Sequence, residues 1–219
     1  MILSKRLETI IYLVDQGENV ADIGSDHGFI VIELINRNIA ASCLAVENKI
    51  GPYTNLVKNT SLIKNIKTSL SDGLKEVDKQ FSTVIIAGMG FNTIKEIIND
   101  SIEKLDFIDT FIIDSHTLTY ELRKFMSEIG YFIKDEQCLI ENKIFYEIIK
   151  FQKGHKVYSE VELKYGPILL NNRSEDFITH YSNQIEKLKS LVRLHQISSI
   201  RKKEIALEIS SLEAIIYEN

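Results

Sequence analysis

The chain has 219 residues, of which 44% are hydrophobic and 26% are charged, a balance typical of a folded globular protein rather than a disordered one. Its length suits one α/β domain with a small appendage rather than two cores of ordinary size. The formal net charge of -5 repels polyanions, so a nucleic-acid partner would have to be held by a local basic patch.

In the first 155 residues, short apolar runs typical of strands take turns with longer segments that have helical periodicity. The expected strands are residues 20–23, 43–46, 66–70, 83–87 and 110–114, and the expected helices are residues 4–17, 29–35, 51–63, 92–102 and 120–129. Because the strands are continuously apolar, we expect a parallel sheet with helices on both faces. Two further segments, 131–139 and 143–151, predict an antiparallel hairpin at one edge of this sheet.

The pattern changes at Lys156, where the residues become typical of paired helices. Two apolar series follow spacings of three and four residues: Ile178, Tyr181, Ile185, Leu188, Val192 and His195, and then Ile205, Ile209, Leu212 and Ile216. We place the turn between them near Ser198-Ser199. The sequence therefore predicts a domain over residues 1–155 and a C-terminal antiparallel helical hairpin, or coiled coil, over residues 156–219.

Cysteine usage and hydropathy restrict where the protein works. The two cysteines, Cys43 and Cys138, form no CxxC motif, which argues against a disulfide scaffold and a cysteine-based zinc site and fits a reducing compartment. No apolar run approaches the roughly 20 residues that span a bilayer, and the first residues lack the features of a signal peptide. We expect a cytoplasmic protein, a monomer or weak dimer, without a membrane segment or a metal.

Glycines and acids follow the expected strands at the end where ligands of open α/β sheets bind. They are Asp22, Gly24, Asp26 and His27 after the first strand, Glu47 after the second, Asp72 and Gly73 after the third, Gly88, Met89 and Gly90 after the fourth, and Asp114, Ser115 and His116 after the fifth. The opposite ends of the strands carry no comparable set. The carboxyl edge of the sheet is therefore the predicted site.

The loop Gly24-Ser25-Asp26-His27-Gly28 distinguishes between two cofactors. A dinucleotide site uses Gly-x-Gly-x-x-Gly to approach a pyrophosphate, but this loop lacks the middle glycine and carries an acid. S-adenosylmethionine has a sulfonium and an ammonium instead, and Asp22 and Asp26 would attract these cations. Glu47 would accept hydrogen bonds from the ribose hydroxyls, and Asp72 would accept one from the adenine amino group. The loop therefore favours the methyl donor.

Each of these residues also has a purely structural interpretation. Asp22 or Asp26 could cap a helix, Glu47 could be a solvated loop acid, and the glycines could serve only turns with positive φ. His27 and His116 could be structural hydrogen-bond partners, which is the commoner use of histidine. Only the joint pattern indicates a cofactor site.

Basic residues gather around one end of the predicted hairpin: Lys187, Lys189, Arg193, Arg201, Lys202 and Lys203. This cluster could meet an RNA backbone, or it could be the solvated face of a coiled coil. We select Lys187, Arg201, Lys202 and Lys203 as RNA contacts, together with Arg6 at the start of the first helix. The histidines in this part of the chain have no metal-ligand spacing.

Several short motifs form a recognisable set. They are Leu3-Ser4-Lys5-Arg6-Leu7, Ala21-Asp22-Ile23-Gly24-Ser25-Asp26-His27, Glu47 with Gly51-Pro52-Tyr53, Ser71-Asp72-Gly73-Leu74 and Ile86-Ala87-Gly88-Met89-Gly90. Together they resemble the bacterial tRNA adenine(22)-N1-methyltransferase family. The resemblance implies a class I, Rossmann-like methyltransferase domain over residues 1–151. Tyr165-Gly166-Pro167 and the following hairpin are similar to the coiled-coil extension of that family.

The resemblance implies methyl transfer from S-adenosylmethionine to N1 of an adenine, position 22, in the D-arm of tRNA. The implied cofactor-binding residues are Asp22, Gly24, Asp26, His27, Glu47, Asp72, Gly73, Ala87, Gly88 and Met89. Two positions depart from the family. Asp114-Ser115-His116 stands where the family usually has Gln-Pro-Asn, and Phe91 stands where it tends to have glycine.

The chemistry of adenine N1 indicates what catalysis requires. Neutral N1 keeps a lone pair, so its attack on the sulfonium methyl group needs positioning rather than deprotonation, and the product is a cation. Asp114 is the first candidate for stabilising that charge, with Asp26 and His27 as further catalytic candidates. A paired or stacked adenine would first have to be extruded. Two alternatives remain open: a degenerate methyltransferase fold that binds tRNA without catalysis, and a nicotinamide-dependent oxidoreductase.

Overall fold

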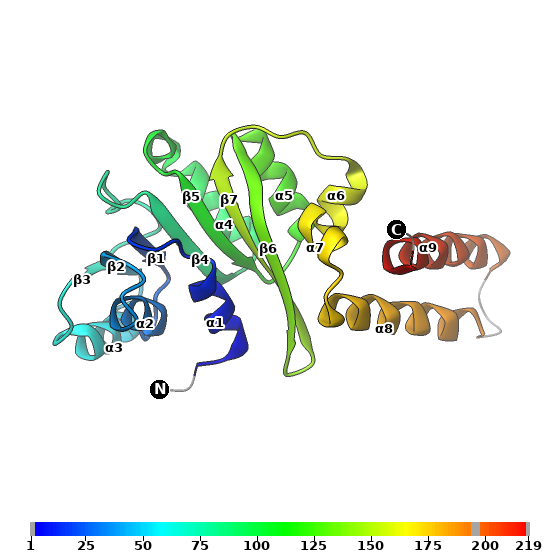
Figure 1. The fold of residues 1–219 in the computed structure, drawn as a ribbon, viewed down its shortest axis with the longest axis horizontal. Coiled ribbons are helices and arrows are strands. Elements are labelled where there is room, and N and C mark those ends of the chain that lie inside the picture. The colour runs from blue at the N-terminus through cyan, green and yellow to red at the C-terminus, as the bar shows by residue number, and fades with distance from the viewer. Residues whose placement is uncertain (1–2, 194–197, 218–219) are drawn as a thin grey trace.

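The computed structural model describes residues 3–193 and 198–217, and within these residues seven strands form one sheet (Figure 1). The strands are β1 (Asn19–Ile23), β2 (Ser42–Glu47), β3 (Ile66–Leu70), β4 (Thr83–Met89), β5 (Thr110–Ser115), β6 (Tyr131–Glu141) and β7 (Ile144–Lys153). Their spatial order is β3-β2-β1-β4-β5-β7-β6. Strands β1 to β5 pair in parallel, whereas β7 runs antiparallel to both β5 and β6. The predicted sheet and its antiparallel edge hairpin are confirmed.

Helices cover both faces of this sheet. They are α1 (Lys5–Tyr12), α2 (Phe29–Asn36), α3 (Ile50–Thr60), α4 (Phe91–Asn99), α5 (Thr119–Glu128), α6 (Glu160–Tyr165), α7 (Pro167–Asn172), α8 (Glu175–Val192) and α9 (Ser199–Tyr217), with a 3₁₀ turn over Ile102–Asp106. Residues of α1, α2 and α3 share one core with the sheet, and residues of α4 and α5 share the other. In Figure 1, α1 lies in front of the sheet and α4 and α5 lie behind it.

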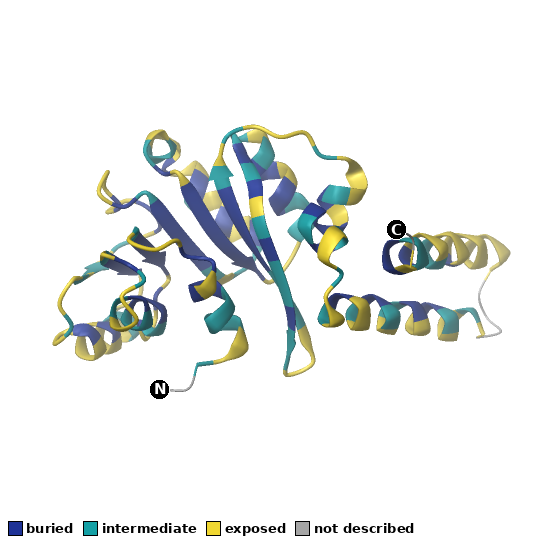
Figure 2. Ribbon diagram, in the orientation of Figure 1, coloured by how far each residue is buried: buried dark blue, intermediate teal, exposed yellow. Residues whose placement is uncertain are grey.

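Neighbouring residues of the central strands enter different cores. In β1, Val20 packs with the helices of one face, and Ala21 packs with those of the other. Since both faces are covered, nearly every residue of β1 and β5 is buried, as are residues 83–86 of β4 (Figure 2). This burial explains why these strands are continuously apolar in sequence rather than alternating.

The β6–β7 hairpin brings a turn to the same edge as the predicted site. Asn142 and Lys143 both have positive φ, 51° and 66°, as a tight two-residue turn requires. In the register between β5 and β7, Asp114 lies opposite Ile148. The hairpin tip, residues 141–144, therefore extends past the carboxyl end of β5.

Helices α8 and α9 project away from the sheet as an arm (Figure 1). Their shared core includes Tyr181, Ile185 and Leu188 of α8 and Ile205, Leu212 and Ile216 of α9. The predicted helical hairpin is confirmed, but Ile178 was wrongly placed in its apolar stripe. Ile178 is 37% exposed, whereas Phe177 is buried because it lies four residues before Tyr181 on the same face. The predicted stripe residue His195 lies outside the described residues, as does the chain over 194–197.

Helix ends and short helices differ from the predictions. Helix α1 ends at Tyr12 rather than near Gly17, and α4 ends at Asn99 rather than at residue 102. The sequence patterns missed α6 and α7, because each has only six residues and shows no full apolar period. Within the described residues, no helix combines the length and apolarity needed to cross a bilayer.

A buried ionic cluster joins α6 and α7 to the sheet. Arg123 of α5 donates from Nε to Glu136 Oε1 (2.7 Å) and from Nη2 to Glu147 Oε1 (2.6 Å). The other oxygen of Glu136 accepts from the backbone N–H of Ile168 (3.0 Å). Gly166, with φ +85°, passes so close that a Cβ would lie 2.7 Å from Glu136 Oε2. The cluster therefore determines where the chain leaves the sheet to build the arm.

Candidate functional site

The loop after β1 is anchored to β2 by its backbone. The N–H groups of Gly24 and Ser25 both donate to the carbonyl of Val46, at 2.8 and 3.0 Å. The following helix, α2, has Gly28 as its N-cap and no side-chain capping bond. Neither Asp22 nor Asp26 caps this helix, so the capping interpretation of these acids is wrong.

Asp22 is a buried carboxylate at the end of β1. Its side chain accepts a hydrogen bond from Ser25 Oγ (2.6 Å), and the residue is 3% exposed. Burial raises the pKa of Asp22 to about 6, the Ser25 hydrogen bond lowers it, and the nearby Glu47 raises it further. Among the described residues, no cationic side chain forms an ion pair with Asp22. The carboxylate therefore lacks the partner that a buried charge requires.

Glu47 is held rigidly at the end of β2. Its Oε1 accepts from the backbone N–H groups of Asn48 and Lys49, both at 3.0 Å, and its Oε2 accepts from that of Asp26 at 3.3 Å. The residue is buried, so it is no solvated loop acid. A carboxylate offers about four acceptor positions, so roughly one remains for a ligand hydroxyl.

Two hollows flank Gly24 at this edge. One is lined by Gly24, Val46, Asn48, Asp72, Leu74 and Met89, among others. The other is lined by Arg6, Asp22, Gly24, Asp26, His27 and Ala87, among others. Gly24 has φ +75°, and a Cβ there would collide with Cε of Met89. A ligand that occupied both hollows would have to pass over this glycine.

Asp72 lies at the mouth of the first hollow, and Gly73 lies beside it. Its carboxylate accepts hydrogen bonds from Lys75 Nζ (3.0 Å) and from Asn48 Nδ2 (3.4 Å). The hydrogen bond from Lys75 lowers the pKa of Asp72 most, and the one from Asn48 lowers it further. Sequence analysis missed Asn48, although its place directly after Glu47 was a usable signal.

Asp114 lies at the end of β5 and is completely buried. Arg6 Nη1 donates to Asp114 Oδ2 (3.0 Å) and also contacts His116 Nε2 at 3.0 Å. Because a guanidinium only donates, Nε2 of His116 is the acceptor and the imidazole proton lies on Nδ1. Burial raises the pKa of Asp114, while the Arg6 guanidinium and the nearby backbone of Gly88 lower it. Its second oxygen, Oδ1, has no hydrogen-bond partner among the described residues.

Tyr146 of β7 completes this second group. The Arg6 guanidinium lies over its ring, 5.3 Å from the centroid, and the His116 ring meets it edge-on at 6.2 Å. Sequence analysis missed Tyr146 because only the antiparallel pairing of β5 and β7 brings it beside His116. Arg6 contacts a protein carboxylate and an aromatic ring here, and Gly88 passes close to its guanidinium.

Asp26 and His27 lie at the outer rim of the second hollow. Both side chains are exposed, and His27 Nε2 lies 3.6 Å from Asp26 Oδ2. The His27 ring stacks on Phe29 with a centroid distance of 5.3 Å. The structure thus brings both residues close to Asp22 while their side chains stay exposed.

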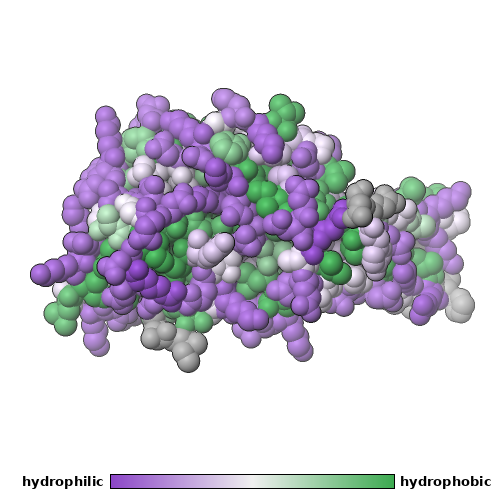
Figure 3. All heavy atoms as spheres, in the orientation of Figure 1, coloured by the Kyte–Doolittle hydropathy of each residue, from purple (hydrophilic) through white to green (hydrophobic). Residues whose placement is uncertain are grey.

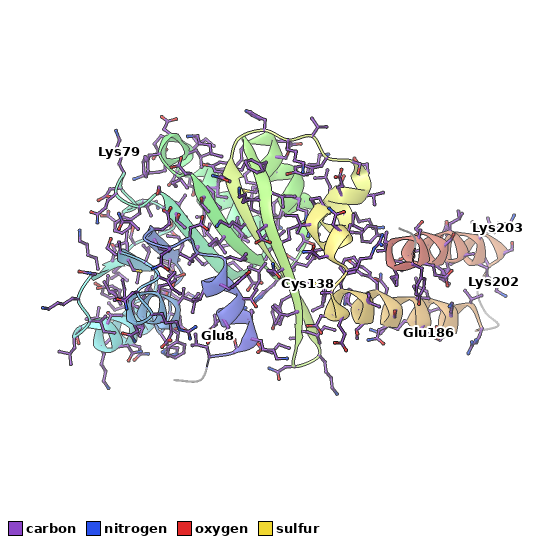
Figure 4. All side chains as sticks on the ribbon, in the orientation of Figure 1. Glu8, Lys79, Cys138, Glu186, Lys202 and Lys203 are labelled. Carbon is purple, nitrogen blue, oxygen red and sulfur yellow. The ribbon has the colours of Figure 1, made fainter. Side chains whose placement is uncertain are left out.

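The predicted RNA contacts other than Arg6 lie on the arm, away from this rim. Lys202 and Lys203 are exposed at the far end of the arm, on the opposite side of the molecule from Lys79 (Figure 4). Arg201 forms an exposed ion pair with Glu204 (2.8 Å), and Lys187 lies on α8. Among the described residues, no group of three His, Cys, Asp or Glu side chains is placed to hold a metal ion.

Comparison with known protein families matches residues 20–218 to TrmK, described as tRNA (adenine(22)-N(1))-methyltransferase. The chain belongs to this family. A tRNA (adenine(22)-N(1))-methyltransferase of Bacillus subtilis is 26% identical over 232 aligned residues, which cover 98% of this chain and 97% of that protein.

Solved structures of two relatives contain cofactor molecules. Streptococcus pneumoniae Sp1610, in complex with S-adenosyl-L-methionine, has a TM-score of 0.88 and 29% identity and covers 99% of this chain and 100% of its own. M. capricolum TrmK, in complex with S-adenosyl-homocysteine, has a TM-score of 0.82 and 28% identity and covers 99% of this chain and 98% of its own. The predicted class I methyltransferase fold and family resemblance are confirmed.

Proposed function

We propose that this TrmK-family protein transfers a methyl group from S-adenosylmethionine to N1 of an adenine in tRNA, at position 22 of the D-arm. The observation that carries this proposal is the chemistry of the β1 and β2 ends, where Asp22 is buried without a cationic partner among the described residues. Family membership over residues 20–218 supports the same reaction.

The residues present fit a cationic sulfur compound. Asp22 would hold the ammonium group, since a cation there relieves the cost of the buried charge. Glu47 would accept a ribose hydroxyl, and Asp72 with Asn48 would meet the adenine ring. The bound S-adenosylmethionine would supply an electrophilic methyl group. A pyrophosphate placed beside Asp22 and Glu47 would be repelled, which argues against a nicotinamide-dependent oxidoreductase.

The second group of residues would orient the target base. Adenine N1 needs no base to attack, so positioning and charge stabilisation are what the protein has to provide. We assign Asp114 to stabilising the positive charge that develops on the adenine ring. Arg6 is then a positioning residue, because it holds Oδ2 of Asp114 and leaves Oδ1 free for a donor such as the adenine amino group. Asp26 and His27 remain candidates at the rim of the same hollow.

The division of labour along the chain follows from these placements. Residues 1–155 would bind the methyl donor and the target base, and residues 156–219 would grip the RNA through Lys187, Arg201, Lys202 and Lys203. All the groups invoked come from one chain, so a monomer or weak dimer suffices for activity. A tRNA substrate would place the protein in the cytoplasm.

The decisive experiment is methylation of unmodified tRNA followed by nucleoside mass spectrometry. We expect one N1-methyladenosine per tRNA, and none with a tRNA in which adenine 22 is replaced by guanine. A protein that binds this tRNA and the methyl donor but adds no methyl group would be the catalytically degenerate alternative. Binding of a nicotinamide dinucleotide in place of S-adenosylmethionine, measured by calorimetry, would reject the proposal altogether.

A further inference from the structure

A third hollow lies outside the site described above, between the hairpin tip and α8. Its lining includes Lys143 and Phe145 of the hairpin and His180, Asn183, Gln184 and Lys187 of α8. We call this hollow the α8 corner. The tip is held against α8 by a hydrogen bond from the backbone N–H of Ile140 to Asp176 Oδ2 (3.1 Å). The two walls of the corner are therefore fixed relative to each other.

An aromatic pair forms part of the α8 corner. The rings of Phe145 and His180 are stacked, with centroids 3.9 Å apart and an interplanar angle of 15°. The Tyr181 ring meets His180 edge-on and holds it from the side. Burial lowers the pKa of His180, and Lys187 lowers it further against the opposing effect of Glu147, so the imidazole is neutral at pH 7. A neutral, partly exposed ring is suited to stacking on a flat base.

Polar groups surround this aromatic pair. The amides of Asn183 and Gln184 have no hydrogen-bond partner in the part of the chain that the structure describes, so their donors and acceptors remain available. Lys143 and Lys187 are exposed at the corner. The one acid that lines it, Glu186, has Lys189 within 3.6 Å. The corner thus combines a π surface, free amides and a small excess of positive charge.

The α8 corner and the methyl-transfer site share a strand and an edge of the sheet. Consecutive residues of β7 point to opposite faces, so Tyr146 meets Arg6 while Phe145 meets His180. Figure 1 shows the hairpin tip between α1 and α8, and Figure 3 shows hydrophilic side chains over both the tip and the arm, mixed on the arm with hydrophobic ones. An RNA strand can therefore cross the tip from one position to the other.

We propose that the α8 corner binds an unpaired nucleotide of the substrate RNA, whose base stacks on His180 and hydrogen-bonds to Asn183 or Gln184. Lys143 and Lys187 meet its phosphates. This inference rests on the proposed tRNA substrate. It adds a base-binding subsite next to the one for the target adenine, and it explains how the arm takes part in choosing the RNA rather than only attracting it.

The test replaces the stacking surface and measures kinetics with full-length tRNA. His180→Ala should raise the KM for tRNA about tenfold, because one base stacked on an aromatic ring contributes on that scale. The kcat and the affinity for S-adenosylmethionine should stay near wild type, since the corner touches neither the donor nor the methyl group. His180→Phe should restore the KM, because it keeps the flat ring. Asn183→Ala, on an exposed residue, should raise the KM about threefold, the scale of one hydrogen bond.

The matched control is His155→Ala, an exposed histidine that follows β7 at the amino edge of the sheet. It should leave the KM unchanged. Wild-type KM values for both His180→Ala and Asn183→Ala, or no rescue by His180→Phe, would overturn the inference while leaving the methyl-transfer reaction intact. Filter binding of the same tRNA tests the corner independently: unchanged affinity of both variants would also overturn the inference. Loss of methylation in the wild type would contradict the proposed function and not the subsite.

Discussion

The protein holds carboxylates away from solvent in two places, which differ in whether a cationic side chain pairs with them. At the junction with the arm, Glu136 and Glu147 are both bound by Arg123. At the carboxyl edge of the sheet, Asp22 is bound only by the neutral hydroxyl of Ser25. In the first arrangement each carboxylate has a cationic partner, although one guanidinium serves both and burial still raises the pKa of Glu136. The second arrangement has no positive charge.

At the junction, Arg123 is the shared partner of both carboxylates. Burial by itself would lower the pKa of Arg123, but Glu147 and Glu136 raise it above the ordinary value for arginine. The guanidinium also donates to the carbonyl of Leu163 (3.3 Å), and Glu136 accepts from the backbone of Ile168. No ligand is needed for these charges, so the cluster serves architecture.

At the carboxyl edge, the buried acids are not fully paired. Asp114 is intermediate between the two extremes, because Arg6 satisfies Oδ2 while Oδ1 has no partner among the described residues. A buried acceptor left unpaired costs free energy unless something binds it. The comparison teaches that the incompletely paired acids, and not the buried acids as such, indicate the functional site.

The largest effect is expected from Arg123→Met at the junction. The change leaves Glu136 buried without its cation, and breaking a buried ion pair in this way costs about 3–5 kcal/mol of unfolding free energy. Urea denaturation measures the loss. The double variant Arg123→Met/Glu136→Met should lose less than the single variant, because it also removes the uncompensated charge. A double variant as unstable as the sum of both single variants would contradict this account.

Asp114→Asn should act on turnover rather than on donor binding. Removing one group that stabilises transition-state charge typically lowers kcat by roughly 10²–10³-fold. Single-turnover methylation of tRNA measures the change, and calorimetry with S-adenosylmethionine serves as the control, where no change is expected. Near-normal turnover would remove Asp114 from the mechanism and leave Asp26 as the candidate.

Asp22→Asn should weaken binding of the methyl donor and, at the same time, stabilise the ligand-free protein. The affinity for S-adenosylmethionine should fall about 10–100-fold, the scale of a hydrogen bond to a charged group. The ligand-free variant should be more stable than the wild type at pH 8 by about 1–3 kcal/mol, since the folded state raises the pKa of Asp22 from 3.8 to about 6.

The raised pKa of Asp22 makes both the stability of the protein and its affinity for the methyl donor depend on pH. Between about pH 4 and 6 the folded protein binds more protons at Asp22 than the unfolded chain, so this contribution to stability falls as the pH rises through that range. A bound ammonium group competes with the proton, so donor affinity should fall as the pH drops below about 6. Calorimetry at several pH values checks this, and Asp22→Asn should flatten the profile. A wild-type affinity that is constant from pH 7 to 5 would contradict the proposed role.

The smallest effect concerns the exposed charges of the arm. Lys202→Glu/Lys203→Glu should weaken tRNA binding by less than tenfold at moderate salt and reduce the slope of log affinity against log salt by about 2, one for each lost phosphate contact. Donor affinity should not change. Lys79→Glu is the control, because Lys79 is an exposed lysine on the other side of the molecule (Figure 4). Unchanged tRNA affinity would make the patch a solvated face.

The grouping of the residues that we propose for the cofactor could be predicted, because most of them lie close together in sequence. Asp22, Gly24 and Asp26 belong to one loop, and Glu47 and Asp72 each follow a strand whose parallel pairing the apolar pattern predicts. Carboxyl ends of parallel strands must meet at one edge, so these residues had to come together. Their positions in the sequence were therefore enough to predict that they lie at the same edge of the sheet.

The target side depended on contacts that sequence patterns do not encode. Arg6 and Asp114 are 108 residues apart, and Tyr146 arrives from a hairpin that runs against the rest of the sheet. The hairpin was predicted, but not which strand it pairs with or in which register, since a shift of one residue would point Phe145 rather than Tyr146 at Arg6.

The sequence by itself determined the alternation of strands and helices, the acidic loop that favours a cation and the apolar stripes of the arm, because periodicity and loop chemistry act over a few neighbouring residues. Only the tertiary structure decided which acids are paired. Arg123 forms ion pairs with Glu136 and Glu147. Arg6 pairs with only one oxygen of Asp114, and Asp22 has no cationic partner among the described residues. Burial and long-range contacts set the energy of a charge, and these exist only once the chain has folded.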